Sequence, residues 1–184
     1  DIYMNFENCV KERRSVRKFT EEKISHETFE KIIELARFAP SWKNSQTARY
    51  HIIEDTDIKT KVAEEAVMNF VFNEKTIKRA PALVVLTAVG KKSGYEEDGS
   101  FSTSKEDRWE VFDAGIACQT FCLSAYNEGV GSVVLGIFDD KKVKEICEIP
   151  EEENVMALIA VGYRDGEAKA APERLAVKDL VSFK

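Results

Sequence analysis

Three arginines and a serine lie within five residues, in the run Arg13-Arg14-Ser15-Val16-Arg17. Guanidinium groups pair with phosphate oxygens through two parallel hydrogen bonds, and a hydroxyl adds another donor. Such a cluster therefore suits a bound phosphate monoester. The alternative is a solvated basic helix end, since arginine favours the negative end of the helix dipole. These five residues alone favour the solvated helix end, so the phosphate site is a hypothesis that needs support from elsewhere in the chain.

A second polar cluster follows one helix later, in the loop Pro40-Ser41-Trp42-Lys43-Asn44-Ser45-Gln46. Its hydroxyl and amide groups could contact a ligand, or they could satisfy the backbone of the loop itself. The indole of Trp42 could form the wall of a ligand site or anchor the core or an interface. Both alternatives remain open from these residues alone.

Other kinds of site find little support. With only His26 and His51 present, a zinc site would need unusual ligands, and we predict no metal. Neither histidine has a persuasive nucleophile or orienting acid beside it in the sequence, so no Ser-His-Asp set can be proposed. The run Gly129-Val130-Gly131 lacks the third glycine of a dinucleotide-binding fingerprint, and the strand should precede those glycines.

Composition limits the class of protein. The chain has 184 residues, 43% of them hydrophobic and 33% charged, which fits one domain or one subunit of an intertwined oligomer. A net charge of −6 opposes a general nucleic-acid binder, and no apolar run is long enough to span a membrane. The four cysteines show no disulfide framework, and we expect Cys118 and Cys122 to be buried thiols. We predict a cytoplasmic protein.

Hydrophobic periodicity predicts alternating helices and strands, in a mixed order with too few strands for a regular doubly wound sheet. Proline at position 40 ends the second helix, and Gly129 ends a long one. Gly115 inside the long helix indicates a close backbone approach there. We expect helices over residues 5–14, 25–39, 57–68, 76–79, 109–128 and 139–147, and strands over residues 49–54, 83–89, 131–136 and 156–163.

Two segments stand outside this pattern. Residues 91–108 form a long polar stretch, and loops of this length are typically lids, binding loops or disordered. Its Tyr95 and Phe101 could cap a site, although loop aromatics more often pack locally. The apolar residues of the tail over 167–184 have little core of their own to join. We therefore expect the tail to pack on another element or another subunit, and Trp109 to belong to an interface core.

Together, the run over residues 13–19 and the loop over residues 40–46 resemble the two N-terminal signatures of the FMN-dependent nitroreductase family. Three later features extend the resemblance: Phe72-Asn73-Glu74-Lys75, the segment over residues 129–136, and Arg174. Either signature alone is weakly specific, whereas the ordered set of five is strongly specific. The resemblance covers essentially the whole chain.

The resemblance implies an α+β fold, with a central mixed, mainly antiparallel sheet flanked by helices. It also implies an intertwined homodimer with two FMN molecules at the subunit interface. Residues 1–184 would form a single FMN-binding domain. Within it, residues 91–108 would be a variable lid-like insertion, and residues 167–184 would be a tail packed on the partner subunit.

The resemblance also implies which residues hold the cofactor. The phosphate and ribityl chain would be gripped by Arg13, Arg14, Ser15 and Arg17, with Arg174 closing on the phosphate. The isoalloxazine ring and ribityl chain would be lined, from the partner subunit, by Pro40, Ser41, Trp42, Asn44 and Gln46. The pyrimidine edge would bond to Asn73, while N5 and O4 would face the backbone N–H groups of Leu135 and Gly136.

The implied activity is that of an NAD(P)H-dependent FMN oxidoreductase. Hydride would pass from NADH or NADPH to flavin N5, and a nitroaromatic, quinone or similar electron-poor acceptor would then be reduced in a ping-pong cycle. No catalytic side chain is expected, because a flavin carries the redox chemistry itself. The chain departs from the family at Gln46-Thr47-Ala48, where many members have Gln-Pro-Trp, and at Leu135, where some members carry an acidic residue.

Three alternatives remain open from the sequence. The chain could be a specialised reductive flavoenzyme, such as a dehalogenase-like relative, or a flavin-binding carrier or sensor with little turnover. A pure interaction domain that uses the acidic surface would bind no cofactor. Against that third alternative, an acidic chain has little general reason to gather arginines around a hydroxyl unless an anion binds there.

Overall fold

The computed structural model describes residues 4–184, so residues 1–3 of the predicted domain lie outside the described residues. The helices are α1 (Phe6–Glu12), α2 (His26–Ala36), the 3-10 turn η1 (Trp42–Asn44), α3 (Thr56–Glu65), α4 (Val71–Arg79), α5 (Arg108–Asn127), α6 (Asp140–Ile146) and α7 (Val177–Leu180). The strands are β1 (Ala48–Ile53), β2 (Ala82–Val89), β3 (Gly131–Leu135) and β4 (Glu153–Gly162).

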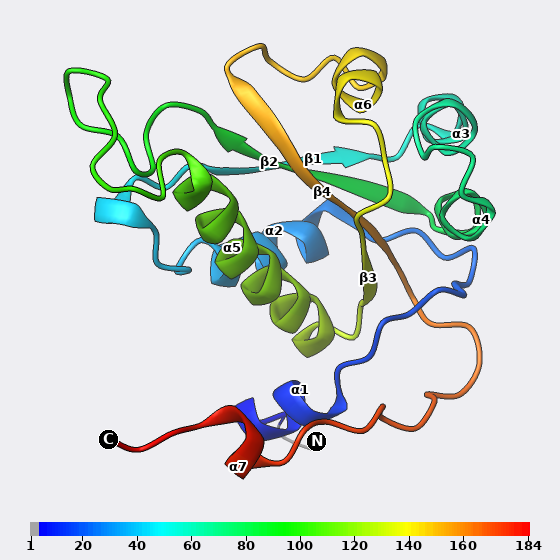
Figure 1. Ribbon diagram of the computed structural model, residues 1–184. Coiled ribbons are helices and arrows are strands. Elements are labelled where there is room, and N and C mark those ends of the chain that lie inside the picture. The colour runs from blue at the N-terminus through cyan, green and yellow to red at the C-terminus, as the bar shows by residue number, and fades with distance from the viewer. Residues whose placement is uncertain (1–3) are drawn as a thin grey trace.

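The four strands form one sheet in the order β1-β2-β4-β3, and every neighbouring pair is antiparallel (Figure 1). An isolated bridge between Ser15 and Ser132 adds a parallel contact at the β3 edge. The predicted α+β fold, with a mainly antiparallel sheet flanked by helices, is confirmed. The apolar run of β2 is buried along almost its whole length, as expected of an inner strand.

Helices cover both faces of the sheet (Figure 1). On one face, α2 and α5 pack around Ile32, Leu86 and Phe121. On the other face, α3, α4 and α6 enclose a second cluster that includes Leu83 and Leu158. Alternating side chains of β2 and β4 supply both clusters, because successive residues of a strand point to opposite faces. The sheet is therefore the shared wall of two hydrophobic cores.

Local signals in the sequence explain where several helices begin and end. The side chains of Asn5 and Ser25 accept hydrogen bonds from the first turns of α1 and α2, and Asp139 does the same for α6. Gly129 follows α5 with a φ of 77°, the left-handed conformation that stops a helix. The predicted stop at Gly129 is confirmed, and Ser25 caps the start of α2.

Helix α5 carries apolar residues on two faces, one in the core and one exposed. Phe121 is fully buried in the core, whereas Phe112 is 59% exposed and Val111 is 62% exposed. The close approach expected at Gly115 does not occur within one chain, since a Cβ added there would meet no atom within 4 Å. Cys118 and Cys122 are buried as predicted, and hydrogen bonding with Cys122 and burial raise the pKa of the Cys118 thiol.

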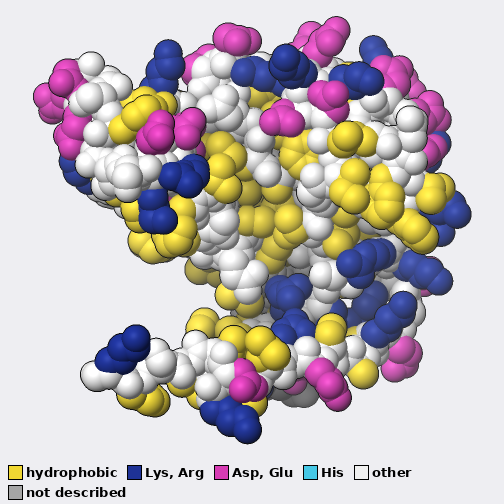
Figure 2. Space-filling view, in the orientation of Figure 1, with side chains coloured by type: hydrophobic (Ala, Val, Ile, Leu, Met, Phe, Trp, Pro, Cys, Tyr) yellow, Lys and Arg dark blue, Asp and Glu magenta, His cyan; other side chains and the backbone are white. Residues whose placement is uncertain are grey.

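The segment over residues 167–184, here called the arm, leaves the body after β4 and ends away from the sheet (Figure 1). Its apolar side chains are exposed, with Leu180 at 69% and Phe183 at 91%. Figure 2 shows a deep hollow between the arm and the body, with hydrophobic side chains on both sides of it. The arm thus buries little of its own apolar surface in this chain.

Among residues 4–184, no helix is long and apolar enough to cross a membrane.

Gly162, the last residue of β4, packs closely against Pro81 and Phe19, and a substitution there tests this contact. A Cβ at Gly162 would lie 2.7 Å from Cδ of Pro81 and 2.8 Å from Cδ1 of Phe19. We expect Gly162→Ala to destabilise the protein by about 1–3 kcal/mol, because the Pro81 ring and the buried Phe19 ring must shift. The matched control is Gly136→Ala, where the new Cβ meets nothing within 4 Å. Thermal unfolding of the cofactor-free proteins measures both variants; equal midpoints for the two would contradict the packing described here.

Candidate cofactor-binding site

The arginine-rich run is fixed in place by the ends of β3 and β4. The N–H of Val16 donates to the carbonyl of Ser132 at 2.9 Å, and further along Thr20 donates to the carbonyl of Tyr163 at 2.8 Å. Val16 and Phe19 are buried in the core, while Ser15 and Arg17 on either side of Val16 are exposed. Because side chains alternate in extended backbone, burial of Val16 turns its two neighbours outward together.

The other arginines of the predicted phosphate grip have different surroundings. Arg13 and Arg14 line a cavity of ≈ 440 Å³ with Arg164, between the ends of α5, β3 and β4. The Arg14 guanidinium donates to the carbonyl oxygens of Lys11 (2.7 Å), Arg13 (3.0 Å) and Lys169 (3.2 Å), which ties the end of α1 to the start of the arm. Basic side chains gather where the arm joins the body (Figure 2).

The structure does not bring Arg174 to this cluster within one chain. Its guanidinium is exposed on the arm and donates to the carbonyl of Pro172 at 3.0 Å. Arg174 is not among the residues that line the cavity beside Arg13 and Arg14. Its predicted closure on the phosphate stays a prediction.

The C-terminal end of β3 brings three further predicted residues together. The amide of Asn73, near the start of α4, is buried and donates to the carbonyl of Ile137 at 3.1 Å. Asn73 is therefore held beside the backbone of Leu135 and Gly136, the predicted contacts of N5 and O4. The residues near Ser132 and those near Leu135 thus lie at the two ends of one edge strand, three residues apart.

The loop over residues 40–46 carries the remaining predicted contacts. Pro40, Ser41 and Gln46 line a separate cavity of ≈ 390 Å³ between α2, β1 and α5. Tyr50 also lines it, and burial raises the pKa of its phenol to about 12, so the phenol stays neutral. The exposed Asn44 and the partly buried Trp42 belong to the same turn. The five predicted residues are therefore neighbours, as the sequence suggests.

Sequence reasoning missed the side chain that holds this loop. Asp113 of α5 is only 5% exposed, and its Oδ2 accepts hydrogen bonds from the N–H of Trp42 (3.0 Å) and from Oγ of Ser93 (2.6 Å). Trp42 also packs on Trp109, with ring centroids 5.0 Å apart. The available signal was a carboxylate on the buried side of a long helix, shared by Glu110 and Asp113, since a buried charge needs partners.

The predicted lid, residues 91–108, is held by contacts within the segment and by a hydrogen bond to Trp109 of α5. Tyr95 and Phe101 pack on each other at 5.0 Å, which supports local packing over capping of a site. The indole N–H of Trp109 donates to the hydroxyl of Thr103 at 2.9 Å. Ser93, at the start of the segment, is fully buried.

The two sets of predicted residues do not meet within one chain. The arginine run lies beside β3 at one edge of the sheet, whereas the 40–46 loop enters β1 at the opposite edge (Figure 1). A single ligand could therefore not touch both sets in a lone subunit. The sequence-based assignment of the 40–46 loop to a partner subunit is compatible with this separation.

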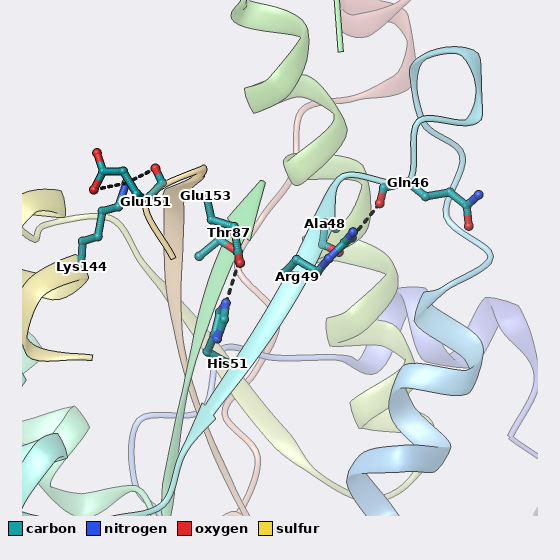
Figure 3. A network of polar contacts seen from close by, with 8 residues as sticks. All are labelled: Gln46, Ala48, Arg49, His51, Thr87, Lys144, Glu151 and Glu153. Atoms are coloured by element: carbon teal, nitrogen blue, oxygen red, sulfur yellow. Dashed lines mark hydrogen bonds and ion pairs between the residues drawn. The ribbon is translucent and has the colours of Figure 1, made fainter. Parts of the chain in front are cut away.

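A second network absent from the sequence analysis lies across β1, β2 and β4 (Figure 3). Oε1 of the buried Glu153 lies 2.7 Å from Nε2 of His51 and accepts a hydrogen bond from the Thr87 hydroxyl at 2.5 Å. Burial works to raise the pKa of Glu153, but the hydrogen bonds from Thr87 and His51 outweigh it and leave that pKa below its usual value. Arg49, two residues before His51 on β1, donates to the carbonyl of Gln46 at 2.8 Å and so braces the end of the loop.

An open antiparallel sheet between two helical layers, with arginine and serine side chains beside its edge strand, is the architecture of this chain. The chain belongs to the nitroreductase family, whose family model matches residues 10–76 and 70–163. A relative from Archaeoglobus fulgidus, named "Putative NADH dehydrogenase/NAD(P)H nitroreductase", is 32% identical over 168 residues that cover 88% of each chain.

Solved structures show the same similarity. A nitroreductase family protein from Clostridium novyi NT superposes with a TM-score of 0.75 at 31% identity, over 88% of this chain and 86% of that one. A protein from Clostridium difficile R20291, titled FMN-dependent nitroreductase, gives a TM-score of 0.76 at 26% identity, over 97% of this chain and 98% of that one. The predicted family and fold are confirmed.

The lowered pKa of Glu153 predicts a pH-dependent contribution to stability. Because the folded-state pKa lies below the unfolded-state value, the contribution is present above the unfolded-state pKa and is lost as pH falls through the folded-state pKa. We expect Glu153→Gln to lower the free energy of unfolding at pH 7 by about 1–3 kcal/mol and to flatten its fall as pH drops below the unfolded-state pKa of the carboxyl. Urea unfolding at several pH values measures this. The control Glu151→Gln removes a fully exposed carboxylate and should change neither quantity.

Proposed function

We propose that this protein is an FMN-dependent oxidoreductase that takes hydride from NADH or NADPH and reduces nitroaromatic, quinone or similar electron-poor acceptors. The observation that carries the proposal is the order of the hydrogen-bond donors along the edge strand β3. Ser15 and Arg17 point outward at its start, and Asn73 sits beside Leu135 and Gly136 at its end. The family membership and the names of the relatives support the same activity.

The donor set fits FMN. Ser132 and Leu135 are three residues apart on β3, a distance of roughly 10 Å, which a five-carbon ribityl chain with its phosphate can span. Arginine and serine donors at one end suit the phosphate, and the amide and backbone groups at the other end suit the heteroatoms of a flavin ring. We propose that Arg13, Arg14, Ser15, Arg17 and Arg174 hold the phosphate and ribityl chain.

The residues of the chain bind and orient, and none acts as acid or nucleophile. When bound, FMN supplies the redox chemistry, because its N5 accepts hydride from a nicotinamide and the reduced ring passes electrons to the acceptor in a ping-pong order. Asn73 and the N–H groups of Leu135 and Gly136 would orient the ring edge. Arginines at the phosphate supply binding energy far from the reacting atom, which fixes the position of the ring.

The same proposal includes a homodimer with two cofactors. Exposed Phe112 and Val111 on α5, and exposed Leu180 and Phe183 on the arm, leave apolar surface that a second subunit would bury. Gly115 lies on the same exposed face of α5, where the predicted close approach could occur between subunits. The partner's 40–46 loop, with residues corresponding to Pro40, Ser41, Trp42, Asn44 and Gln46, would then complete each site.

An absorption spectrum after adding FMN, desalting and reducing tests the activity. We expect about one flavin retained per chain, with visible bands that bleach within seconds under anaerobic NADH or NADPH. Reoxidation by a nitroaromatic or a quinone would identify the acceptor class. Flavin that is retained but resists both nucleotides would indicate a carrier or sensor. Complete loss of flavin on desalting, with no effect of FMN on the melting temperature, would contradict the proposal.

The phosphate grip is tested by Arg17→Ala against the neighbouring Lys18→Ala. Both side chains are exposed, but Arg17 is predicted to hold the phosphate and Lys18 is not. Loss of a charge-assisted hydrogen bond should raise the FMN dissociation constant about tenfold or more in Arg17→Ala, and leave it within about twofold in Lys18→Ala. Fluorescence titration of FMN measures both. Equal affinities of the two variants would remove Arg17 from the site.

Light scattering coupled to size-exclusion chromatography tests the dimer. The wild-type protein should elute at twice the mass of the chain. Phe112→Glu, which places a charge on the exposed apolar face of α5, should elute as a monomer and lose FMN. The control Lys141→Glu changes an exposed charge on α6, in the opposite helical layer, and should remain dimeric. A wild-type monomer that still binds FMN would contradict the shared site.

A further inference from the structure

We propose that Asp113 is a positioning residue: its buried carboxylate fixes the 40–46 loop in the conformation that reaches the cofactor, and couples that loop to the 91–108 segment. The proposal rests on the proposed function for its link to FMN. It concerns a residue that neither the sequence motifs nor the family resemblance single out.

The first support is the geometry around one oxygen atom. Oδ2 of Asp113 accepts both the N–H of Trp42, at 3.0 Å, and the hydroxyl of Ser93, at 2.6 Å. Trp42 is the first residue of η1, and the N-cap of that turn, Ser41, makes no side-chain capping bond to it. The carboxylate of Asp113 therefore caps the turn from a different element, helix α5. A carboxylate at the start of a helical turn is the favoured arrangement for the free N–H groups there.

The second support is the backbone conformation that this cap holds. Lys43, Asn44 and Gln46 have φ values of 46°, 53° and 50°, in the left-handed region that non-glycine residues rarely occupy. Three such residues within four positions persist only where surrounding contacts enforce them. Within the loop, the N–H of Gln46 donates to the Ser41 hydroxyl at 3.0 Å. Asp113 adds the link from the strained turn to a rigid helix.

The third support is the second partner of the carboxylate. Ser93 is fully buried, and its hydroxyl lies 3.0 Å from the hydroxyl of Ser45 as well as 2.6 Å from Asp113. Ser93 belongs to the 91–108 segment, so one buried chain of hydrogen bonds joins that segment, α5 and the loop. Packing of Trp42 on Trp109 strengthens the same junction. Sequence changes in the 91–108 segment that disturb Ser93 should therefore alter flavin binding without touching the flavin.

The test compares two buried carboxylates of the same helix. Asp113→Ala removes the cap of the loop. Glu110→Ala, one turn earlier, removes an equally buried carboxylate that accepts from Asn154 at 3.1 Å and makes no hydrogen bond to the 40–46 loop in the described structure. Two readouts are used: amide hydrogen exchange of a peptide covering residues 41–46 in the cofactor-free protein, and the FMN dissociation constant.

We expect Asp113→Ala to raise both the exchange rate of that peptide and the FMN dissociation constant about tenfold or more. Glu110→Ala should leave the exchange rate and the FMN dissociation constant within about twofold of the wild-type values, even if it lowers the melting temperature as much as Asp113→Ala does. Asp113→Asn keeps one oxygen that can accept both donors, so it should restore most of the protection and affinity. If Asp113→Ala fails to fold, Ser93→Ala carries the test: it should weaken FMN binding at least threefold, and wild-type affinity in Ser93→Ala would overturn the positioning role.

The outcomes separate this inference from the proposed function. Wild-type protein that binds FMN, together with an Asp113→Ala variant that exchanges and binds like wild type, overturns the positioning role and leaves the function standing. Equal loss of affinity in Asp113→Ala and Glu110→Ala also overturns it, because general destabilisation then explains both. A wild-type protein that binds no FMN overturns the cofactor link along with the function, while faster exchange confined to Asp113→Ala would still support the cap itself.

Discussion

The contact between the extended run over residues 15–19 and the ends of β3 and β4 is the constraint on which the site depends. Val16 and Phe19 enter the core, and they fit only because Gly131 and Gly162 carry no side chains where they approach. A methyl group at either glycine would lie under 3 Å from them. Alternation then leaves Ser15 and Arg17 facing outward beside an edge strand. Close packing of Val16 and Phe19 against these two glycines thus fixes the position of the Arg17 side chain.

Helix α5 organises the other half of the molecule. Its inner face fills the core through residues such as Phe121, and its outer face exposes Phe112 beside Gly115. Between these faces, the Asp113 carboxylate reaches the 40–46 loop and the 91–108 segment together. A buried charge is costly unless hydrogen-bond donors compensate it. Here the cost is offset by two donors from loops that have little regular structure of their own.

A lone chain leaves much apolar surface uncovered, and it also leaves the predicted cofactor contacts divided between opposite edges of the sheet. Exposed apolar side chains lie on the arm and on the outer face of α5, and a hollow separates the arm from the body (Figure 2). Both facts have one physical explanation in the proposed homodimer. Burial of the apolar surfaces would bring the arginine run of one subunit and the loop of the other to the same ligand.

By itself, the sequence determined the family, the α+β fold, the course of nearly every helix and strand, and the stop at Gly129, because periodicity, caps and glycines act locally. It also determined that residues of the 40–46 loop cluster, since they are neighbours in the chain. Only the tertiary structure showed the second face of α5, the Glu153 network and the Asp113 cap. The Glu153 network and the Asp113 cap join residues roughly 20 to 100 positions apart, and such contacts depend on packing that no local spacing encodes.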